Sequence, residues 1–91
     1  MTPAVEHQPG RFVLRLEGHV AELVYERRGD VLDIQHTFTP PPLRGREVAA
    51  RLTEAAFAYA RSAGLRVVPT CSYAARYVAR HPEVRALVQD A

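Results

Sequence analysis

The sequence predicts a mixed α/β fold of the α+β type, with an antiparallel meander followed by a β-α-β crossover and a final helix. Two observations predict it. Three stretches in the first half alternate apolar and polar residues and are separated by short turns that contain glycine. They are followed by a long stretch with apolar residues at spacings of three and four, and then by a short apolar run. The predicted order is therefore β-β-β-α-β-α.

The three predicted strands of the meander cover residues 11–16, 19–27 and 31–39. Gly18 and Gly29 lie in the turns between them, where glycine accepts a positive φ without steric cost. Because one face of the strands is apolar and the other is largely polar, we expect one side of the sheet to stay wetter. The apolar face of the third strand is expected to hold Leu32, Ile34, His36 and Phe38.

The second half of the chain is predicted to be mainly helical. Helical periodicity extends over residues 44–63, after three prolines that end the third strand, and Gly64 occupies the expected C-cap. Residues 65–69 are predicted to form a short apolar strand. Ser72 is the expected N-cap of a helix that runs to about His81.

The two ends of the chain carry weaker signals. Residues 1–10 contain two prolines and little hydrophobic pattern, so we expect a flexible lead-in there. At the other end, Pro82 can begin a further short helical turn. At 91 residues, the chain is expected to form a single domain over residues 1–91.

The composition excludes several classes of protein. Hydrophobic residues make up 47% and charged residues 24% of the chain, which is typical of a globular protein, and the net charge of +2 is too weak to indicate nucleic-acid binding. One cysteine excludes an internal disulfide and suits a reducing compartment, and the four histidines lack metal-ligand spacing. With neither a signal peptide nor a run of 18 apolar residues, we expect a cytoplasmic location without a membrane span or a metal.

Residues 43–52 are the stretch most suggestive of ligand binding. They join a predicted strand to the long predicted helix through a basic turn that contains Gly45. A strand, a glycine turn and a helix in succession place unpaired N–H groups of the first helical turn against an anion. The sequence therefore predicts a phosphate-bearing ligand at this point.

Three blocks of sequence carry a resemblance to a known family. The first block is residues 36–40 leading into residues 43–46, together with Val48, Ala49 and Leu52. The second block is residues 68–73, and the third is residues 80–83. With these blocks in this order, the chain resembles the GNAT superfamily of N-acetyltransferases, most closely its small bacterial YjdJ-like members, over about residues 12–88. The resemblance implies a minimal GNAT-like acetyl-CoA fold without the usual long N-terminal helical region and last strand pair.

The resemblance also implies a binding site for acetyl-CoA. The third strand, with Thr37, Phe38 and Thr39, would offer main-chain partners to the pantetheine arm. The R-G-x-G-x-A pattern of the family would bind the pyrophosphate at the helix start. Here the pattern departs from the family at one position, where a glutamate replaces the second glycine and brings a like charge toward the phosphates. The matching residues are Arg44, Gly45, Arg46, Glu47, Val48 and Ala49.

Three residues are candidates for catalysis. Cys71 lies between a strand end and a helix start, where it would accept an acyl group or polarise the thioester, or else serve as a small buried residue. Tyr73 approximately matches the tyrosine that family members use as general acid for the CoA thiolate; otherwise it is a half-buried aromatic residue. His36 would deprotonate an ammonium acceptor, or would be a core histidine with a satisfied hydrogen bond.

The arginines are assigned to two groups. Arg44, Arg46 and Arg51 cluster near the predicted helix start and are expected to meet the 3′-phosphate or the pyrophosphate of CoA. Arg76 and Arg80 are expected to belong to a solvated helix face.

The implied function is acetyl-CoA-dependent transfer of an acetyl group to an amine acceptor by a monomer or weak homodimer. The alternative is a non-catalytic or degenerate acyl-CoA-binding module on the same fold, which Glu47 favours. A small nucleic-acid-binding domain is a weaker third option, because the seven aromatic residues are mostly assigned to predicted core faces.

Overall fold

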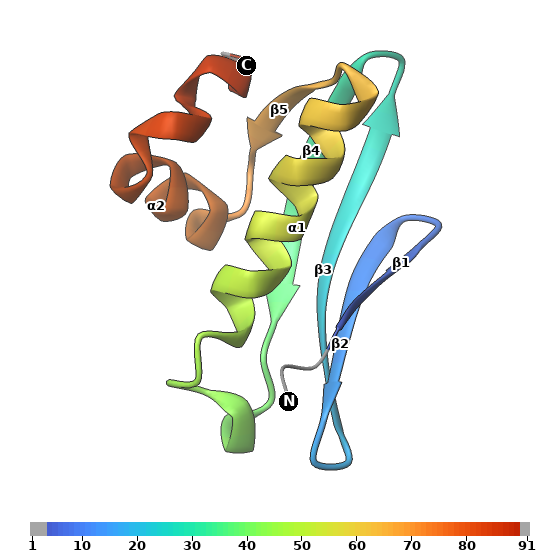
Figure 1. Cartoon of the computed structure of the whole chain (residues 1–91), viewed down its shortest axis with the longest axis vertical. Helices are drawn as coiled ribbons and strands as arrows, with labels where there is room; N and C mark the ends of the chain where they lie inside the picture. Colours follow the sequence, from blue (N-terminus) through green and yellow to red (C-terminus); the bar gives the residue numbers. More distant parts are fainter. Residues whose placement is uncertain (1–3, 90–91) are drawn as a thin grey trace.

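The computed structural model describes residues 4–89 and has a five-stranded sheet with helices packed on it. The strand order is β1-β2-β3-β4-β5, with antiparallel pairing from β1 to β4 and parallel pairing between β4 and β5. Figure 1 shows α1 lying on the sheet along β4, and α2 to its side near β5. The elements are β1 Val5–Gln8, β2 Arg11–Leu16, β3 His19–Arg28, β4 Val31–Phe38, the 3₁₀ turn η1 Pro41–Leu43, α1 Val48–Ala63, β5 Arg66–Pro69, α2 Ser72–Arg80 and the 3₁₀ turn η2 Pro82–Leu87.

The predicted fold class and the crossover are confirmed. The chain leaves β4, passes through α1 and returns to pair β5 in parallel beside β4, from Val31 opposite Arg66 to Ile34 opposite Pro69. The core lies between the sheet and the two helices, where apolar side chains from the sheet, α1 and α2 pack together. Its largest fully buried members include Leu14, Leu23, Leu32, Ile34, Leu43, Leu52 and Val67.

The expected flexible lead-in is wrong for Val5–Gln8, which forms the edge strand β1 of the sheet. The part of the prediction that concerns residues 1–3 lies outside the described residues. The meander therefore has four strands and not three. His7 accounts for much of the attachment of β1, because its ring stacks on Phe12 at 4.2 Å, meets Tyr59 of α1 at 4.5 Å and hydrogen-bonds Tyr25.

A β-bulge in β4 changes which residues face the core. Tyr25 of β3 lies opposite Ile34, whereas Val24 lies opposite His36, so Gln35 is an extra residue that reverses the alternation. The expectation that His36 and Phe38 share the face of Ile34 is therefore wrong. Both lie on the opposite face, where Phe38 is 46% exposed.

Several predicted boundaries shift at the helices. The long helix begins at Val48 and not at residue 44, because residues 44–47 form a turn that ends with Glu47 in the left-handed region at φ 59°. The C-cap is Gly64, as predicted. Cys71, and not Ser72, is the N-cap of α2, which ends at Arg80. The further turn that begins at Pro82 is confirmed as η2.

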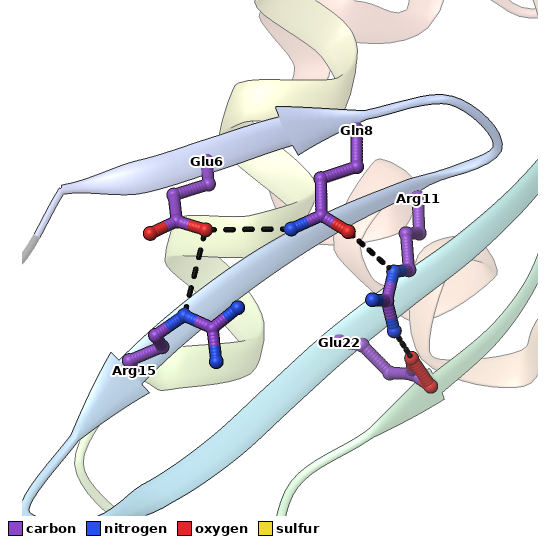
Figure 2. Close-up of polar contacts among 5 residues, drawn as sticks. All are labelled: Glu6, Gln8, Arg11, Arg15 and Glu22. Carbon is purple, nitrogen blue, oxygen red and sulfur yellow. Dashed lines mark hydrogen bonds and ion pairs between the residues drawn. The ribbon is translucent and has the colours of Figure 1, made fainter.

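The face of the sheet opposite α1 is largely polar, as the alternation predicts. Figure 2 shows charged and amide side chains of β1, β2 and β3 that join across this face by hydrogen bonds and ion pairs. Val13 of β2 lies on the same face and is fully buried, with β1 and β3 paired on either side of it. Exposed ion pairs contribute little each, about 0–1 kcal/mol. The residues drawn are Glu6, Gln8, Arg11, Arg15 and Glu22.

Two further findings concern residues 4–89. None of their helices has the length and apolar character required to cross a membrane. In the same range, no group of three or more histidine, cysteine, aspartate or glutamate side chains is arranged to hold a metal ion.

The contacts of β1 give a first prediction. Changing His7→Ala should lower the free energy of unfolding by about 1–2 kcal/mol, because it removes a ring stack and a hydrogen bond. Urea unfolding followed by circular dichroism would measure the change. His19→Ala is the matched control, since His19 has no aromatic stack and no side-chain hydrogen bond within residues 4–89. Equal stability of the two variants would show that β1 is not anchored through His7.

Candidate functional site

The central feature of the site is the separation of β4 from β5. Their parallel ladder ends where Ile34 lies opposite Pro69, and the N–H of Cys71 then donates to the carbonyl of Ile34 at 2.9 Å. From Gln35 to Phe38, β4 has β3 on one side and, among the described residues, no strand on the other. A groove of about 560 Å³ opens there, between the end of β4 and the start of α2. Its lining includes Gln35, His36, Thr37, Phe38, Thr39, Thr70, Cys71, Ser72 and Tyr73.

A second hollow of about 540 Å³ continues this groove toward the start of α1. It is lined by the turn before α1, by the first turn of that helix and by two residues of α2. The two spaces adjoin each other, because the same five residues line both of them. These shared residues are Thr39, Arg44, Ala49, Tyr73 and Arg76.

The start of α1 presents unpaired N–H groups to this second hollow. The N–H of Arg51 is the first to bond back into the helix, to the carbonyl of Glu47 at 3.1 Å. The N–H groups of Val48, Ala49 and Ala50 come earlier and have no acceptor within the helix. The side chain of Glu47 forms no capping hydrogen bond. These N–H groups therefore stay available for an anion, which the helix dipole also favours.

The turn before α1 gives this cradle its shape. Gly45 and Glu47 both adopt a positive φ, at 78° and 59°. A Cβ added to Gly45 would meet nothing within 4 Å, so the space over the turn is open. Arg44 Nε donates to the carbonyl of Thr39 at 3.2 Å, and this contact ties the turn to the end of β4. An open turn with free N–H groups beside it fits the phosphates of a nucleotide.

The predicted basic cluster is divided among different parts of the molecule. Arg44 lines the groove, whereas Arg46 forms an ion pair with Glu17 of the β2–β3 turn at 2.7 Å. Arg51 lines a separate hollow beside Val5. Of the three, Arg44 alone is thus in place to meet an anion in the groove.

Cys71 lies in the groove at the N-terminus of α2. Its Sγ is 3.4 Å from Oγ1 of Thr37, which projects from β4 after the bulge. Burial raises the pKa of the Cys71 thiol, but the hydrogen bond with Thr37 and the N–H groups of Ala74, Tyr73 and Thr37 favour the thiolate, so the pKa lies below its usual value. Cys71 is thus a partly buried thiol whose surroundings favour its reactive form.

Tyr73 lines both parts of the groove and is half-buried. Burial raises the pKa of its hydroxyl; Arg76 and Arg80 act against the increase, and Glu47 adds to it. The hydroxyl therefore keeps its proton at neutral pH. A protonated phenol beside a groove is suited to donate a proton.

His36 occupies a different position from the one its pattern predicted. It is exposed on the sheet face opposite α1 and reaches only the rim of the groove. Thr37, its neighbour in β4, faces the α1 side and contacts Cys71. The structure therefore brings Cys71, Tyr73 and Thr37 together and leaves His36 on the other side of the strand.

Two groove residues were not singled out from the sequence. Arg76 lines both parts of the groove, although its spacing to Arg80 is equally typical of a solvated face. The sequence does carry a signal for Arg76, because a residue three positions after Tyr73 lies next to it on the surface of the same helix. Thr70 lines the groove and donates its hydroxyl proton to the buried carboxylate of Asp33, which Arg28 also contacts at 3.0 Å. This contact fixes the loop from β5 to Cys71.

Comparisons with known proteins bear on the same region. The family model described as GCN5-related N-acetyl-transferase matches residues 11–87. Protein NATD1 of the zebrafish Danio rerio is 39% identical over 83 residues, which cover 86% of this chain and 76% of the relative. Protein NATD1 of Homo sapiens has the same identity, and the match covers 74% of its length.

A solved structure matches the fold. It is the NMR solution structure of a GCN5-like protein from Staphylococcus aureus, with a TM-score of 0.73, 19% sequence identity and coverage of 97% of this chain and 89% of that chain. At this identity the likeness concerns the fold alone. The family model and the NATD1 relatives carry the assignment, and this chain belongs to the family of GCN5-related N-acetyltransferases.

Proposed function

We propose that this protein is an acetyl-CoA-dependent N-acetyltransferase that transfers an acetyl group to an amine. The observation that carries the proposal is that the groove beside Cys71 and Thr37 adjoins the hollow at the open N-terminus of α1. Two adjoining spaces, one with a thiol and the other with an anion cradle, match the chemistry of a thioester on a nucleotide. Each part has a volume within the usual range of ligand pockets, about 300–1,000 Å³.

The residues of the groove fit CoA in three places. The edge of β4 at Thr37, Phe38 and Thr39, which has no neighbouring strand among the described residues, offers main-chain groups to the amides of the pantetheine arm, with the N–H of Thr37 shared with the Cys71 thiol. The N–H groups at the start of α1 face the diphosphate. Arg44 and Arg76 add positive charge to the same stretch of the groove.

Bound acetyl-CoA supplies an acetyl group that is already activated as a thioester. The Tyr73 hydroxyl holds a proton that it can give to a leaving thiolate, because its pKa is raised. Cys71 Sγ, with its lowered pKa, can take a proton from an ammonium group or attack an acyl carbon. His36, at the rim, is placed to accept a proton from an amine that approaches from the open face of the sheet.

A non-catalytic acyl-CoA-binding module on the same fold is the second candidate. The observation that favours it is Glu47, whose carboxylate lines the hollow at the start of α1. A carboxylate there repels the phosphates and lowers affinity for the nucleotide. Binding without turnover would distinguish the module from the enzyme.

Calorimetric titration with acetyl-CoA and CoA tests the proposal, together with thiol release over a panel of amines. Both ligands should bind, and at least one amine should accelerate release of CoA. No binding at millimolar ligand would rule out both the enzyme and the binding module. Binding of acetyl-CoA without release of CoA would rule out the enzyme and support the module.

If the enzyme is active, Tyr73→Phe should lower kcat about 100-fold, which is the lower end of what a general acid contributes. The dissociation constant for acetyl-CoA should stay close to that of the wild type. Tyr59→Phe is the matched control, because Tyr59 lies in the aromatic cluster of His7 and contacts Arg27 at 2.7 Å. An unchanged kcat in Tyr73→Phe would remove Tyr73 from the chemistry.

Two substitutions of Glu47 separate backbone strain from charge. Glu47→Gly should raise the free energy of unfolding by about 0.5–1 kcal/mol relative to Glu47→Ala, because only glycine relieves the positive φ. Both variants should bind CoA more tightly than the wild type, by about fivefold in low salt, because both remove the carboxylate. Unchanged affinity in both would show that the carboxylate does not act on the phosphates.

The surroundings of Cys71 predict the pH dependence of its reactivity. Because its pKa is lowered, alkylation by iodoacetamide should reach half of its maximal rate at a lower pH than for a free cysteine. Thr37→Val should move this midpoint upward, since the hydrogen bond that favours the thiolate is lost. Thr53→Val is the control, because Thr53 donates within α1 to the carbonyl of Ala49 and does not contact the thiol. A midpoint that stays in place in Thr37→Val would contradict the role of Thr37.

A further inference from the structure

The link between β5 and α2 is tied to β4 at two neighbouring points. The N–H of Cys71 donates to the carbonyl of Ile34 at 2.9 Å, and the hydroxyl of Thr70, one residue earlier, donates to the carboxylate of Asp33. Asp33 is only 7% exposed, whereas Thr70 is exposed and lines the groove. A buried carboxylate therefore holds a side chain that a ligand in the groove can reach.

The carboxylate of Asp33 is ionised at neutral pH. Arg28 of β3 contacts it at 3.0 Å, and Arg28 is in turn paired with Glu26 at 3.0 Å. Burial raises the pKa of the Asp33 carboxyl, but hydrogen bonds from Thr70, Arg28 and Gln35 outweigh burial, so the pKa lies below its usual value. Asp33 thus accepts hydrogen bonds and has no proton to donate.

This ionised partner decides how the Thr70 hydroxyl can meet a ligand. A hydroxyl has one proton to donate and two lone pairs that accept. Because the proton of Thr70 goes to Asp33, the oxygen of Thr70 has only lone pairs to offer to the groove. Such an oxygen binds an N–H donor and gives no hydrogen bond to a carbonyl or phosphate oxygen. Thr70 therefore marks the point of the groove that is suited to an amine.

The charges behind this point of the groove favour an ammonium group. Two carboxylates, Glu26 and Asp33, share the one guanidinium of Arg28, which leaves a net negative charge. Gln35 lines the groove beside Thr70 and donates to Glu26 at 3.2 Å, so its side chain is held against this group as well. The arginines of the groove lie in the part shared with the start of α1. A cation is thus favoured at Thr70 and an anion at α1.

We propose that Thr70 binds the amine group of the substrate that receives the acetyl group, and that Asp33 is a positioning residue that holds the Thr70 hydroxyl in its accepting orientation. The proposal rests on the proposed function, because it takes the groove beside Cys71 as the place of acetyl transfer. The substrate is then an amine that enters as ammonium from the side where His36 lines the groove. Thr70 orients its nitrogen, and the proton leaves to Cys71 or His36.

The single cysteine of the chain, Cys71, allows a test that needs no acetyl transfer. The full chain is treated with aminoethyl methanethiosulfonate, which carries an ammonium group, and with the neutral methyl methanethiosulfonate. Each rate of modification is divided by the rate of the same reagent with mercaptoethanol. Because both reagents attack the same thiolate, the ratio of the two normalised rates cancels any change in the pKa of Cys71. The wild type should favour the ammonium reagent about tenfold, the strength of a hydrogen bond to a charged group.

Substitutions of one hydroxyl at a time assign this preference. Thr70→Val should lose it, and Thr70→Ser should keep it, because serine retains the hydroxyl. Ser72→Ala is the matched control, since Ser72 lines the same groove on the other side of Cys71 and makes no side-chain hydrogen bond to a carboxylate within residues 4–89. Asp33→Asn should weaken the preference, because a neutral amide no longer fixes the proton of Thr70. Circular dichroism should show that each variant is folded.

Steady-state kinetics give a second readout that a merely structural role would not move. For an amine that accelerates CoA release, Thr70→Val should raise the KM of that amine about tenfold and leave the KM of acetyl-CoA unchanged. Thr70→Ser should restore the KM of the amine.

The outcomes separate this proposal from the proposed function. If the wild type does not favour the ammonium reagent, or if the preference persists in Thr70→Val, Thr70 does not bind the amine, while CoA release by the wild type would leave the proposed function intact. An equal loss of preference in Ser72→Ala would also overturn the role of Thr70, and full preference in a folded Asp33→Asn would overturn that of Asp33. A preference that depends on Thr70 in a chain that releases no CoA would rule out the enzyme and leave Thr70 as an ammonium-binding residue.

Discussion

The site depends on the point at which β4 and β5 cease to pair. Their ladder ends at Ile34, directly before the extra residue Gln35, and bulges of this kind bend the strand that carries them. The N–H of Cys71 donates to the carbonyl of Ile34. This hydrogen bond holds Cys71 at the point where β4 and β5 separate. Beyond it, no strand in the described part of the chain pairs with this edge of β4, so the edge is open to a ligand. Groove, thiol and open strand edge thus lie together at one local irregularity of β4.

The order of elements could be predicted because amphipathic periodicity is local, but the bulge could not. Apolar or aromatic residues alternate without interruption from Leu32 to Phe38, and this pattern is the one an unbroken strand would give. Only the pairing with β3 shows that Gln35 is inserted. The edge strand Val5–Gln8 was missed for a related reason. It is held by its pairing with β2 and by the contacts of His7 with residues distant in sequence, whereas its own composition resembles a loop.

The parts of the candidate site that depend only on position along the chain could be predicted. Cys71 and Tyr73 flank a strand-to-helix junction, and the groove contains both. Side-chain direction in the turn before α1 could not be predicted, because it depends on neighbours from elsewhere: Arg46 turns toward Glu17 of a distant hairpin. For Arg76 the sequence pattern is ambiguous, because an arginine that lines a hollow and an arginine on a solvated face have the same helical spacing. Only the packing of α2 against α1 distinguishes them.

Glu47 changes the charge of the cradle without changing its shape. The backbone keeps the left-handed conformation that the glycine of the family pattern would adopt easily, so the N–H groups of Val48, Ala49 and Ala50 retain their position. The strain of that conformation costs about 1 kcal/mol and is borne by the fold. In the hollow at the start of α1, the carboxylate of Glu47 is opposed by Arg44 and Arg76. Since two arginines stand against one carboxylate in this hollow, the charge of its lining stays positive, as an anion requires.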